Sequence, residues 1–310
     1  MSLTRNILFS TTSAMLVMSN VALADVTLDT KYGKVTVKDD VKNVVTLHEG
    51  ALDVMSAINF KVAGSVATRG SDTVSRYLAE RQPNIDIVGT ARETNLEAVI
   101  NERPDVILAS PSLSQEQYNM LSKIAPTIVP IGGDYSTPFN WKAEARLFGK
   151  AVSREADVEK AITAVEERAA SIKQKVEQAI PADQRTAYVA RWMPQGPMAM
   201  SKNLFAGTLL AATGFTAEDG GLIKAGRPHS SILSLENISA IDHDWLFLAT
   251  LNEDGKAALD AAKDSPAFSR LNVVQKDHVA TVDGQVWSST SGPLAAHVVL
   301  DDIERLVDNQ

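Results

Sequence analysis

The longest regular pattern of apolar and polar positions runs from Ser153 to Ile180. Apolar residues recur there at intervals of three or four and form one stripe of a helix: Val158, Ile162, Val165, Ala169, Ile172, Val176 and Ile180. Ser153 is the expected N-cap, and Pro181 ends the helix. At 1.5 Å per residue the helix is roughly 39 Å long. Because no heptad array continues it, we predict a strut between two packed units rather than a coiled coil.

Short apolar runs alternate with helical patterns before this helix. After an N-terminal hairpin over 26–38, the pattern predicts strands at 43–47, 62–66, 85–88, 106–109 and 127–131. Helices are predicted between them at 51–58, 71–81, 95–102 and 114–122. Strands of this length separated by helices are typical of a mainly parallel sheet covered on both faces.

The same alternation starts again after the long helix. It predicts strands at 186–191, 198–200, 246–248 and 279–282, with helices at 207–212, 235–241, 255–263 and 294–307. The expected fold class is therefore α/β, with two parallel-sheet lobes joined by one long rigid helix. The expected division is an N-terminal lobe over 25–152, the helix over 153–180 and a C-terminal lobe over 181–310.

A short internal repeat suggests that the two lobes share one design. The segment 95–108 and the segment 234–247 align without a gap, at a separation of 139 positions. Leu, Glu, a β-branched residue, Asp and the following strand coincide in both. Glu97 and Glu236 thereby occupy equivalent places.

Composition and charge indicate an exported protein. Arg5, an apolar run and the small residues Ala22 and Ala24 predict a signal peptide over residues 1–24. Its removal leaves 29 basic against 38 acidic residues, a balance that disfavours nucleic acid and anionic membranes as partners. The chain has no cysteine, which excludes disulfides, thiolate metal sites and a lipid anchor on an N-terminal cysteine. We therefore expect an untethered, monomeric protein of a bacterial periplasm.

Polar and aromatic residues follow several predicted strands, where parallel α/β units form their binding crevice. The candidates for ligand contact are Arg69, Arg92, Tyr135, Arg191, Trp192, Arg227, His229 and Trp287. Arginines suit an anionic, carboxylate-bearing chelate, because the guanidinium fork holds carboxylates and stays charged in a poorly hydrated site. Tryptophans would cover the apolar arms of such a ligand. Simple solvation explains Arg69 and Arg227 equally well, and we expect Trp141 and Trp245 in the core.

Several stretches resemble the periplasmic substrate-binding proteins of iron(III)–siderophore ABC importers, especially the ferric dicitrate-binding type. The likeness covers most of the chain from about residue 42 and rests on segments 88–90, 96–99, 103–108, 124–127 and 280–283, on Trp287 and on the C-terminal helix. The resemblance implies a class III periplasmic binding protein, in which a rigid helix fixes two lobes and the ligand occupies a shallow cleft between them. It also implies little closure on binding.

The resemblance implies residue roles as well. An Arg is common in this family at the strand end where Arg191 stands, and His229 falls where catecholate-binding relatives place a His that can reach iron. A Tyr partner near Trp287 is missing, and Leu204 stands where those relatives have an Arg, which puts a catecholate ligand in doubt. One Glu on each lobe, here Glu97 and Glu236, would dock onto arginines of the membrane permease. Thr94 and Glu97 also have the spacing of a capping box.

The predicted function is capture of an iron(III)–siderophore, of citrate or hydroxamate type, and its delivery to an inner-membrane ABC permease. Iron would arrive already chelated, so no protein metal ligand, cofactor or catalytic residue is expected. Alternatives are a corrinoid- or haem-binding protein of the same fold and, with scattered histidines against it, a zinc- or manganese-binding protein. A hydrolase is disfavoured because the chain has no Gly-x-Ser-x-Gly elbow, phosphate loop or thiol.

Overall fold

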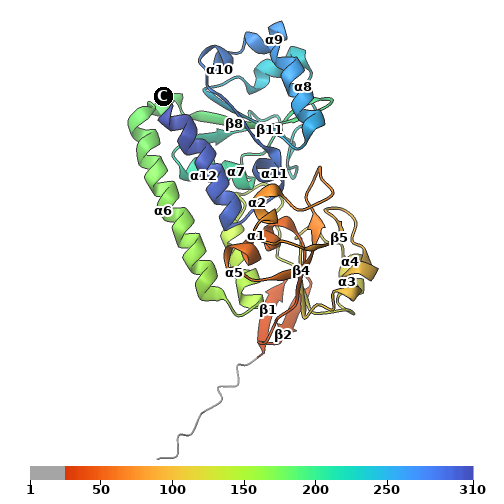
Figure 1. The fold of residues 1–310 in the computed structure, drawn as a ribbon. Coiled ribbons are helices and arrows are strands. Elements are labelled where there is room, and N and C mark those ends of the chain that lie inside the picture. The colour runs from red at the N-terminus through yellow and green to blue at the C-terminus, as the bar shows by residue number, and fades with distance from the viewer. Residues whose placement is uncertain (1–24, 310) are drawn as a thin grey trace, which may run out of the picture.

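The computed structural model describes residues 25–309, in which two α/β lobes stand side by side along one long helix (Figure 1). The predicted signal peptide lies outside the described residues. The α/β fold class with two parallel sheets is confirmed, whereas the exact lobe boundaries stay predictions. None of the described helices combines the length and apolarity needed to cross a bilayer.

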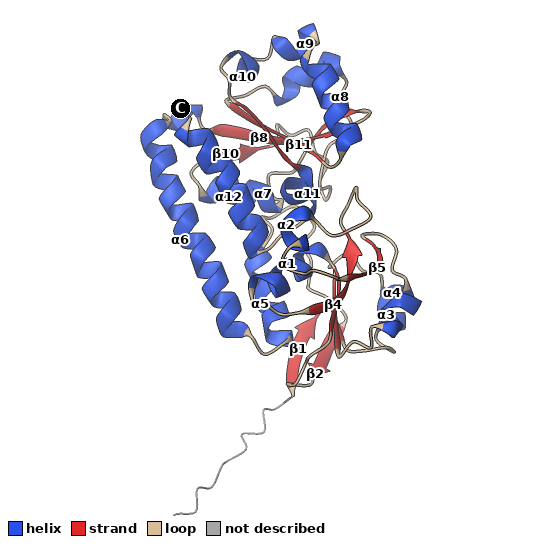
Figure 2. Ribbon diagram, viewed as in Figure 1, coloured by secondary structure: helices blue, strands red, loops and turns tan. Residues whose placement is uncertain are grey.

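The N-terminal lobe is built on a five-stranded parallel sheet (Figure 2). Its strand order is β5 (Asp86–Thr90), β4 (Val62–Ala67), β3 (Val44–Leu47), β6 (Val106–Ala109) and β7 (Thr127–Ile128). The helices of this lobe are α1 (Glu49–Ala57), α2 (Arg76–Ala79), α3 (Leu96–Asn101), α4 (Gln115–Leu121) and α5 (Trp141–Ala151). The predicted hairpin is confirmed as antiparallel β1 (Val26–Thr30) and β2 (Gly33–Val37).

The C-terminal lobe repeats this plan. Its parallel strands lie in the order β10 (Thr216–Glu218), β8 (Thr186–Met193), β11 (Trp245–Thr250) and β12 (Val279–Asp283), and β9 (Gly196–Ala199) pairs antiparallel with β8. The other elements are η1 (Ala182–Gln184), α7 (Phe205–Ala212), η2 (Leu235–Ile241), α8 (Glu253–Lys263), α9 (Pro266–Ser269), α10 (Asn272–Gln275), α11 (Gly284–Ser289) and α12 (Pro293–Asp308).

Strand order supports the relation between the lobes that the repeat indicated. The N-terminal sheet has one extra edge strand, β5. With β5 set aside, the first parallel strand of each sheet (β3 or β8) lies between the second (β4 or β10) and the third (β6 or β11), and the fourth (β7 or β12) lies outside the third. Strands β6 and β11, which follow the repeated segments, therefore occupy the same place in this order.

The strut is α6 (Glu155–Ala179), a single helix of 25 residues. Its predicted apolar stripe is confirmed, because the described side chains from Val158 to Val176 on that stripe are 5% exposed or less. The predicted cap is wrong: Ser153 has a left-handed φ of 54°, the helix begins after Arg154, and no side chain caps it. Ile180 is buried at the C-terminal end as predicted.

A second helix also joins the lobes. Helix α12 comes last in the chain, yet it lies along α6 and reaches α1 of the N-terminal lobe (Figure 1). Arg168 of α6 pairs with Asp301 and with Glu304 of α12, and Lys175 pairs with Glu304. The predicted single interdomain helix is thus α6, and α12 packs along it and helps to fix the spacing between the lobes.

Sequence patterns misplaced a few elements. The helix predicted over 71–81 is wrong in extent, since only Arg76–Ala79 is helical, and residues 235–241 form a 3₁₀ helix. Helix α5 was not predicted, although its face with Trp141, Ala145 and Phe148 is buried against the core. Trp141 and Trp245 are core residues as expected, at 5% and 1% exposed.

Candidate ligand site between the lobes

A cavity of about 640 Å³ lies where the two lobes face each other. Its wall includes residues that follow β3 and β6, the segment 130–140, Arg191 of β8, and Trp287 with the loop that follows it. We refer to residues 288–292, which comprise the last two residues of α11 and its connection to α12, as the cleft loop; Ser288 to Ser291 of this segment line the cavity. The site is thus built at the carboxyl ends of strands, where parallel sheets place their binding crevices.

Arg191 is the most unusual group in this cavity. Its side chain lies inside the cavity wall on β8, with the residue 5% exposed. Nη2 contacts the Met198 sulfur at 3.3 Å, whereas Nε has no hydrogen-bond partner among the described residues. Burial, with smaller contributions from the nearby charges of Arg69 and Arg92, lowers the pKa of Arg191 to about 10. The guanidinium is therefore charged at neutral pH and buried, and no carboxylate among residues 25–309 pairs with it.

Arg69 and Arg92 extend the positive charge outward. Both are exposed residues on loops after β4 and β5, and both line a second hollow of about 760 Å³. Arg69 and Ala91 belong to the walls of both hollows, so the two spaces adjoin. Three arginines from both lobes therefore line two adjoining hollows, which favours an anionic ligand.

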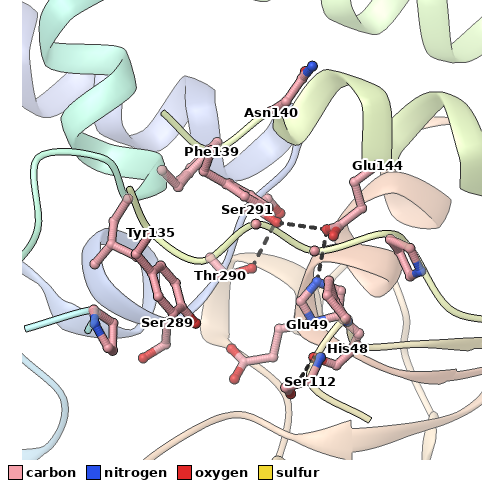
Figure 3. A pocket seen from close by; sticks show the side chains of 18 of the residues that line it. His48, Glu49, Ser112, Tyr135, Phe139, Asn140, Glu144, Ser289, Thr290 and Ser291 are labelled. Atoms are coloured by element: carbon pink, nitrogen blue, oxygen red, sulfur yellow. Dashed lines mark hydrogen bonds and ion pairs between the residues drawn. The ribbon is translucent and has the colours of Figure 1, made fainter. Parts of the chain in front are cut away.

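The opposite wall carries groups that the sequence analysis missed. His48 Nε2 lies 2.9 Å from Glu144 Oε1, and Glu144 Oε2 has no partner among the described residues (Figure 3). Burial disfavours the charged form of His48, but the Glu144 carboxylate outweighs it and raises the pKa of His48. Burial raises the pKa of Glu49, whose carboxylate accepts hydrogen bonds from the Thr68 hydroxyl and the Arg69 amide. His48 and Glu49 directly follow β3. The rule that polar residues directly after parallel strands line the binding crevice, which we call the strand-end rule, could therefore have found them.

Tyr135 lines the cavity from the connection between β7 and α5. Its backbone has a left-handed φ of 62°, and its carbonyl accepts a hydrogen bond from Asn203 Nδ2 at 2.8 Å. The amide of Phe139 also donates to the Asn203 carbonyl, at 2.8 Å. The C-terminal lobe thereby holds this connection against the cavity, with the Tyr135 side chain 40% exposed.

His229 and Trp287 also line the cavity, but in different ways. His229 is half-buried, and its Nδ1 lies 2.8 Å from the Ser230 carbonyl. Trp287 is 2% exposed, stacks on Phe247 with ring centroids 4.7 Å apart, and donates from Nε1 to Asp302. The indole is therefore mainly a core group that supports the cleft loop.

Two predicted ligand residues lie elsewhere. Trp192 is 2% exposed and packs against Phe268 in a separate core cluster, because successive residues of a strand point to opposite faces and Arg191 takes the cavity face. Arg227 is exposed on its loop and lines neither hollow. The structure thus gives no support to either residue as a ligand contact.

Glu97 and Glu236 are exposed at the starts of α3 and η2, on equivalent positions of the two lobes. The predicted capping box with Thr94 is wrong. Asn95 is the N-cap of α3, and its side chain accepts a hydrogen bond from the Ala98 amide at 3.1 Å. Glu97 is therefore not needed as a capping partner.

Residues 25–309 contain no group of three or more His, Asp or Glu side chains placed to hold a metal ion. Arginines, serines and a histidine on the wall can bind a ligand through hydrogen bonds and charge. The carboxylates of Asp29, Glu49 and Glu144 lie in the same wall, so the cavity offers both donors and acceptors to a ligand.

Comparison with known proteins agrees with this geometry. The sequence profile of the family described as "Periplasmic binding protein" matches residues 44–286. The chain is 24% identical over 299 residues to the Fe(3+) dicitrate-binding periplasmic protein FecB of Escherichia coli, covering 96% of this chain and 94% of that one. It is 24% identical over 276 residues to the achromobactin-binding periplasmic protein of Dickeya dadantii, covering 86% of each.

Solved structures show the same fold. The crystal structure of Staphylococcus aureus SirA complexed with staphyloferrin B superposes with a TM-score of 0.74 at 24% identity, over 92% of this chain and 96% of that one. At this identity the likeness establishes the arrangement of lobes and helices, and the residues of the site must be judged from this chain alone.

Proposed function

The chain belongs to the periplasmic binding protein family, and we propose that it captures an iron(III)–siderophore in the periplasm for an ABC importer of the inner membrane. The named relatives support this cargo, since they bind ferric dicitrate and achromobactin. The protein serves as a carrier: it holds the chelate without changing it, and the importer supplies the energy.

One observation supports a negatively charged ligand. Arg191 is a buried guanidinium without a carboxylate partner, and it lies near enough to Arg69 and Arg92 for their charges to lower its pKa. Burying an unpaired cation beside two others costs free energy, which an anionic ligand would recover. We therefore propose a carboxylate-bearing chelate, whose oxygens pair with Arg191 inside the cavity and with Arg69 and Arg92 at its mouth.

Tyr135, His229 and the serines of the cleft loop would complete the contacts. Their hydroxyl, imidazole and amide groups line the cavity and can bond to chelator oxygens that are not engaged by the arginines. No side chain of the protein needs to replace a chelator atom on iron. The iron is cargo, coordinated before it arrives.

Fluorescence titration tests the proposal. Trp287 lines the cavity, so a bound iron(III) complex should quench its emission. The purified protein would be titrated with ferric citrate, a ferric citrate–hydroxamate, a neutral ferric trihydroxamate, a ferric catecholate, haem and cobalamin. We expect saturable quenching with the carboxylate-bearing chelates at the lowest concentrations. Tighter binding of haem or cobalamin than of any iron chelate would contradict the proposal.

Glu97 and Glu236 are proposed as the contacts with the permease. They are exposed, equivalent in the two lobes, and absent from both hollows. Two carboxylates at a fixed spacing can pair with basic residues on a membrane partner. The double substitution Glu97→Ala with Glu236→Ala should leave chelate affinity unchanged and abolish uptake of radioactive iron in cells. Normal uptake by the double variant would remove both residues from the docking surface.

A further inference from the structure

Asp53 is a buried carboxylate of α1 whose hydrogen bonds reach into the other lobe. The residue is 0% exposed. Its Oδ1 accepts from the Leu294 amide at 2.9 Å, and its Oδ2 accepts from the Ala295 amide at 2.7 Å. Tyr77 of α2 donates its hydroxyl to Oδ2 at 2.9 Å. The two amides belong to the first turn of α12, whose N–H groups have no partner within the helix.

The N-terminal lobe therefore supplies the cap for a helix of the C-terminal lobe. The residue before α12 is Gly292, which has no side chain with which to cap it. A Cβ at this position would lie 2.4 Å from Asp53 Oδ1, and Gly292 has a φ of 120° that other residues rarely adopt. Glycine is thus what allows the Asp53 carboxylate to approach the helix end.

The capped helix end is continuous with the wall of the cavity. Gly292 closes the cleft loop, and Ser288 to Ser291 of that loop line the cavity. Further contacts hold the loop from the N-terminal lobe: Thr290 Oγ1 lies 3.4 Å from the Tyr77 hydroxyl, and Ser291 donates to Glu144 at 3.4 Å (Figure 3). These distances are long, so the two short bonds to Asp53 dominate the contact.

We propose that Asp53 is a positioning residue for ligand binding, which holds the cleft loop in the shape that lines the cavity before a ligand arrives. The inference rests on the proposed function of the cavity. Its physical basis is preorganisation: a loop that is already fixed does not lose conformational freedom when the ligand binds. The same contact joins the two lobes beside the segment that lines the cavity.

The test compares Asp53→Asn with Asp105→Asn. The side-chain amide that Asp53→Asn introduces accepts fewer hydrogen bonds than the carboxylate and turns a donor group toward the N–H groups of α12. Asp105 is the control for the loss of backbone hydrogen bonds alone, because its exposed carboxylate also accepts two backbone amides, from Lys42 at 2.9 Å and Asn43 at 2.8 Å. It lies within the N-terminal lobe and lines neither hollow.

Amide hydrogen exchange of residues 288–296 and the affinity for ferric citrate would be measured on all three proteins. We expect Asp53→Asn to speed exchange in this segment and to weaken ferric citrate about tenfold, the effect of losing one buried hydrogen bond between the lobes. Saturating ferric citrate should restore slow exchange in Asp53→Asn, which a general loss of structure would not allow. Asp105→Asn should leave exchange in this segment and affinity at their wild-type values.

Unchanged exchange, or unchanged affinity, in Asp53→Asn would overturn the inference. Failure of the wild type to bind any iron chelate would instead refute the proposed function, and the exchange measurement would still decide whether Asp53 fixes the loop. If Asp53→Asn does not fold, Tyr77→Phe serves in its place, since it removes one donor to the same carboxylate. Smaller changes in the same direction support the inference, and wild-type values for both measurements overturn it.

Discussion

The cleft between the lobes and the contact between α6 and α12, which we call the back of the molecule, differ in how their positive charges are paired. At the back, along the contact between α6 and α12, Arg168 and Lys175 both pair with carboxylates of α12. In the cleft, Arg69, Arg92 and Arg191 make no ion pair with any residue of the described chain. The first set of charges is satisfied within the protein and fixes the two helices together. The second set is available to pair with a ligand, which is the role that we propose for it.

The largest expected effect comes from the buried cation of the cleft. Arg191→Gln should weaken ferric citrate about 100-fold, because a charge-assisted contact inside a poorly hydrated cavity is lost. Binding of a neutral ferric trihydroxamate should change much less, and the two ligands together separate loss of charge from damage to the cavity. Equal weakening of both ligands in fluorescence titrations would mean that Arg191 shapes the cavity without pairing with the ligand.

The exposed arginines should contribute less. The double variant Arg69→Gln with Arg92→Gln should weaken ferric citrate about tenfold at low salt, since exposed charges are screened by solvent and ions. The difference from wild type should shrink as sodium chloride is raised, whereas the effect of Arg191→Gln should persist. Titrations at several ionic strengths measure both. A salt-independent loss in the double variant would place these arginines in direct, dehydrated contact with the chelate.

The charges at the back should affect stability and leave binding alone. Arg168→Gln removes both of its ion pairs to α12 and should lower the free energy of unfolding by about 1 kcal/mol, as expected for a partly exposed pair. Chemical denaturation measures the loss, and ferric citrate titration should give the wild-type affinity. Weaker binding in this variant would show that the contact between α6 and α12 controls the cleft, and the contrast between the two regions would fail.

The smallest expected effect concerns the pair of His48 and Glu144 on the cleft wall. Glu144 raises the pKa of His48 above its ordinary value of 6.5. The stability that this pair contributes is fully present below pH 6.5 and is lost as pH rises through the raised pKa. His48→Gln should therefore lower the free energy of unfolding below pH 6.5 and have little effect well above the raised pKa. Denaturation curves at a series of pH values check this, and a pH-independent difference would contradict the pairing.

The sequence was sufficient for the architecture because the fold depends on long patterns. The apolar stripe of α6, the strand–helix alternation and the repeat at Glu97 and Glu236 each extend over many residues, and single exceptions do not erase them. Helix α5 was not predicted because charged residues interrupt its buried face. One of them, Glu144, points inward and contacts His48. That pairing depends on tertiary structure, which no local pattern records.

The candidate site was only partly predictable for a related reason. The strand-end rule identified Arg191, Arg69 and Tyr135 as residues of the cavity wall, and applied to β3 it would have added His48. It failed at Trp192, where the alternation of the strand sends neighbouring side chains to opposite faces. The role of Asp53 could not be predicted from the sequence. Its carboxylate lies in the middle of an apolar helix, and its hydrogen-bond partners belong to α12, which is distant in the sequence.

The contact between Asp53 and α12 can form only late in the assembly of the molecule. The bond from Leu294 to Asp53 joins residues 241 positions apart, so it can form only when almost the whole chain is present. Each sheet can assemble earlier from strands that are close in sequence, but a chain that stops before its final helix lacks the Asp53 contact and has α6 alone between the lobes. Loss of the final helix should therefore weaken both the contact between the lobes and the core itself, because Val299, Leu300 and Ile303 of α12 are fully buried in it.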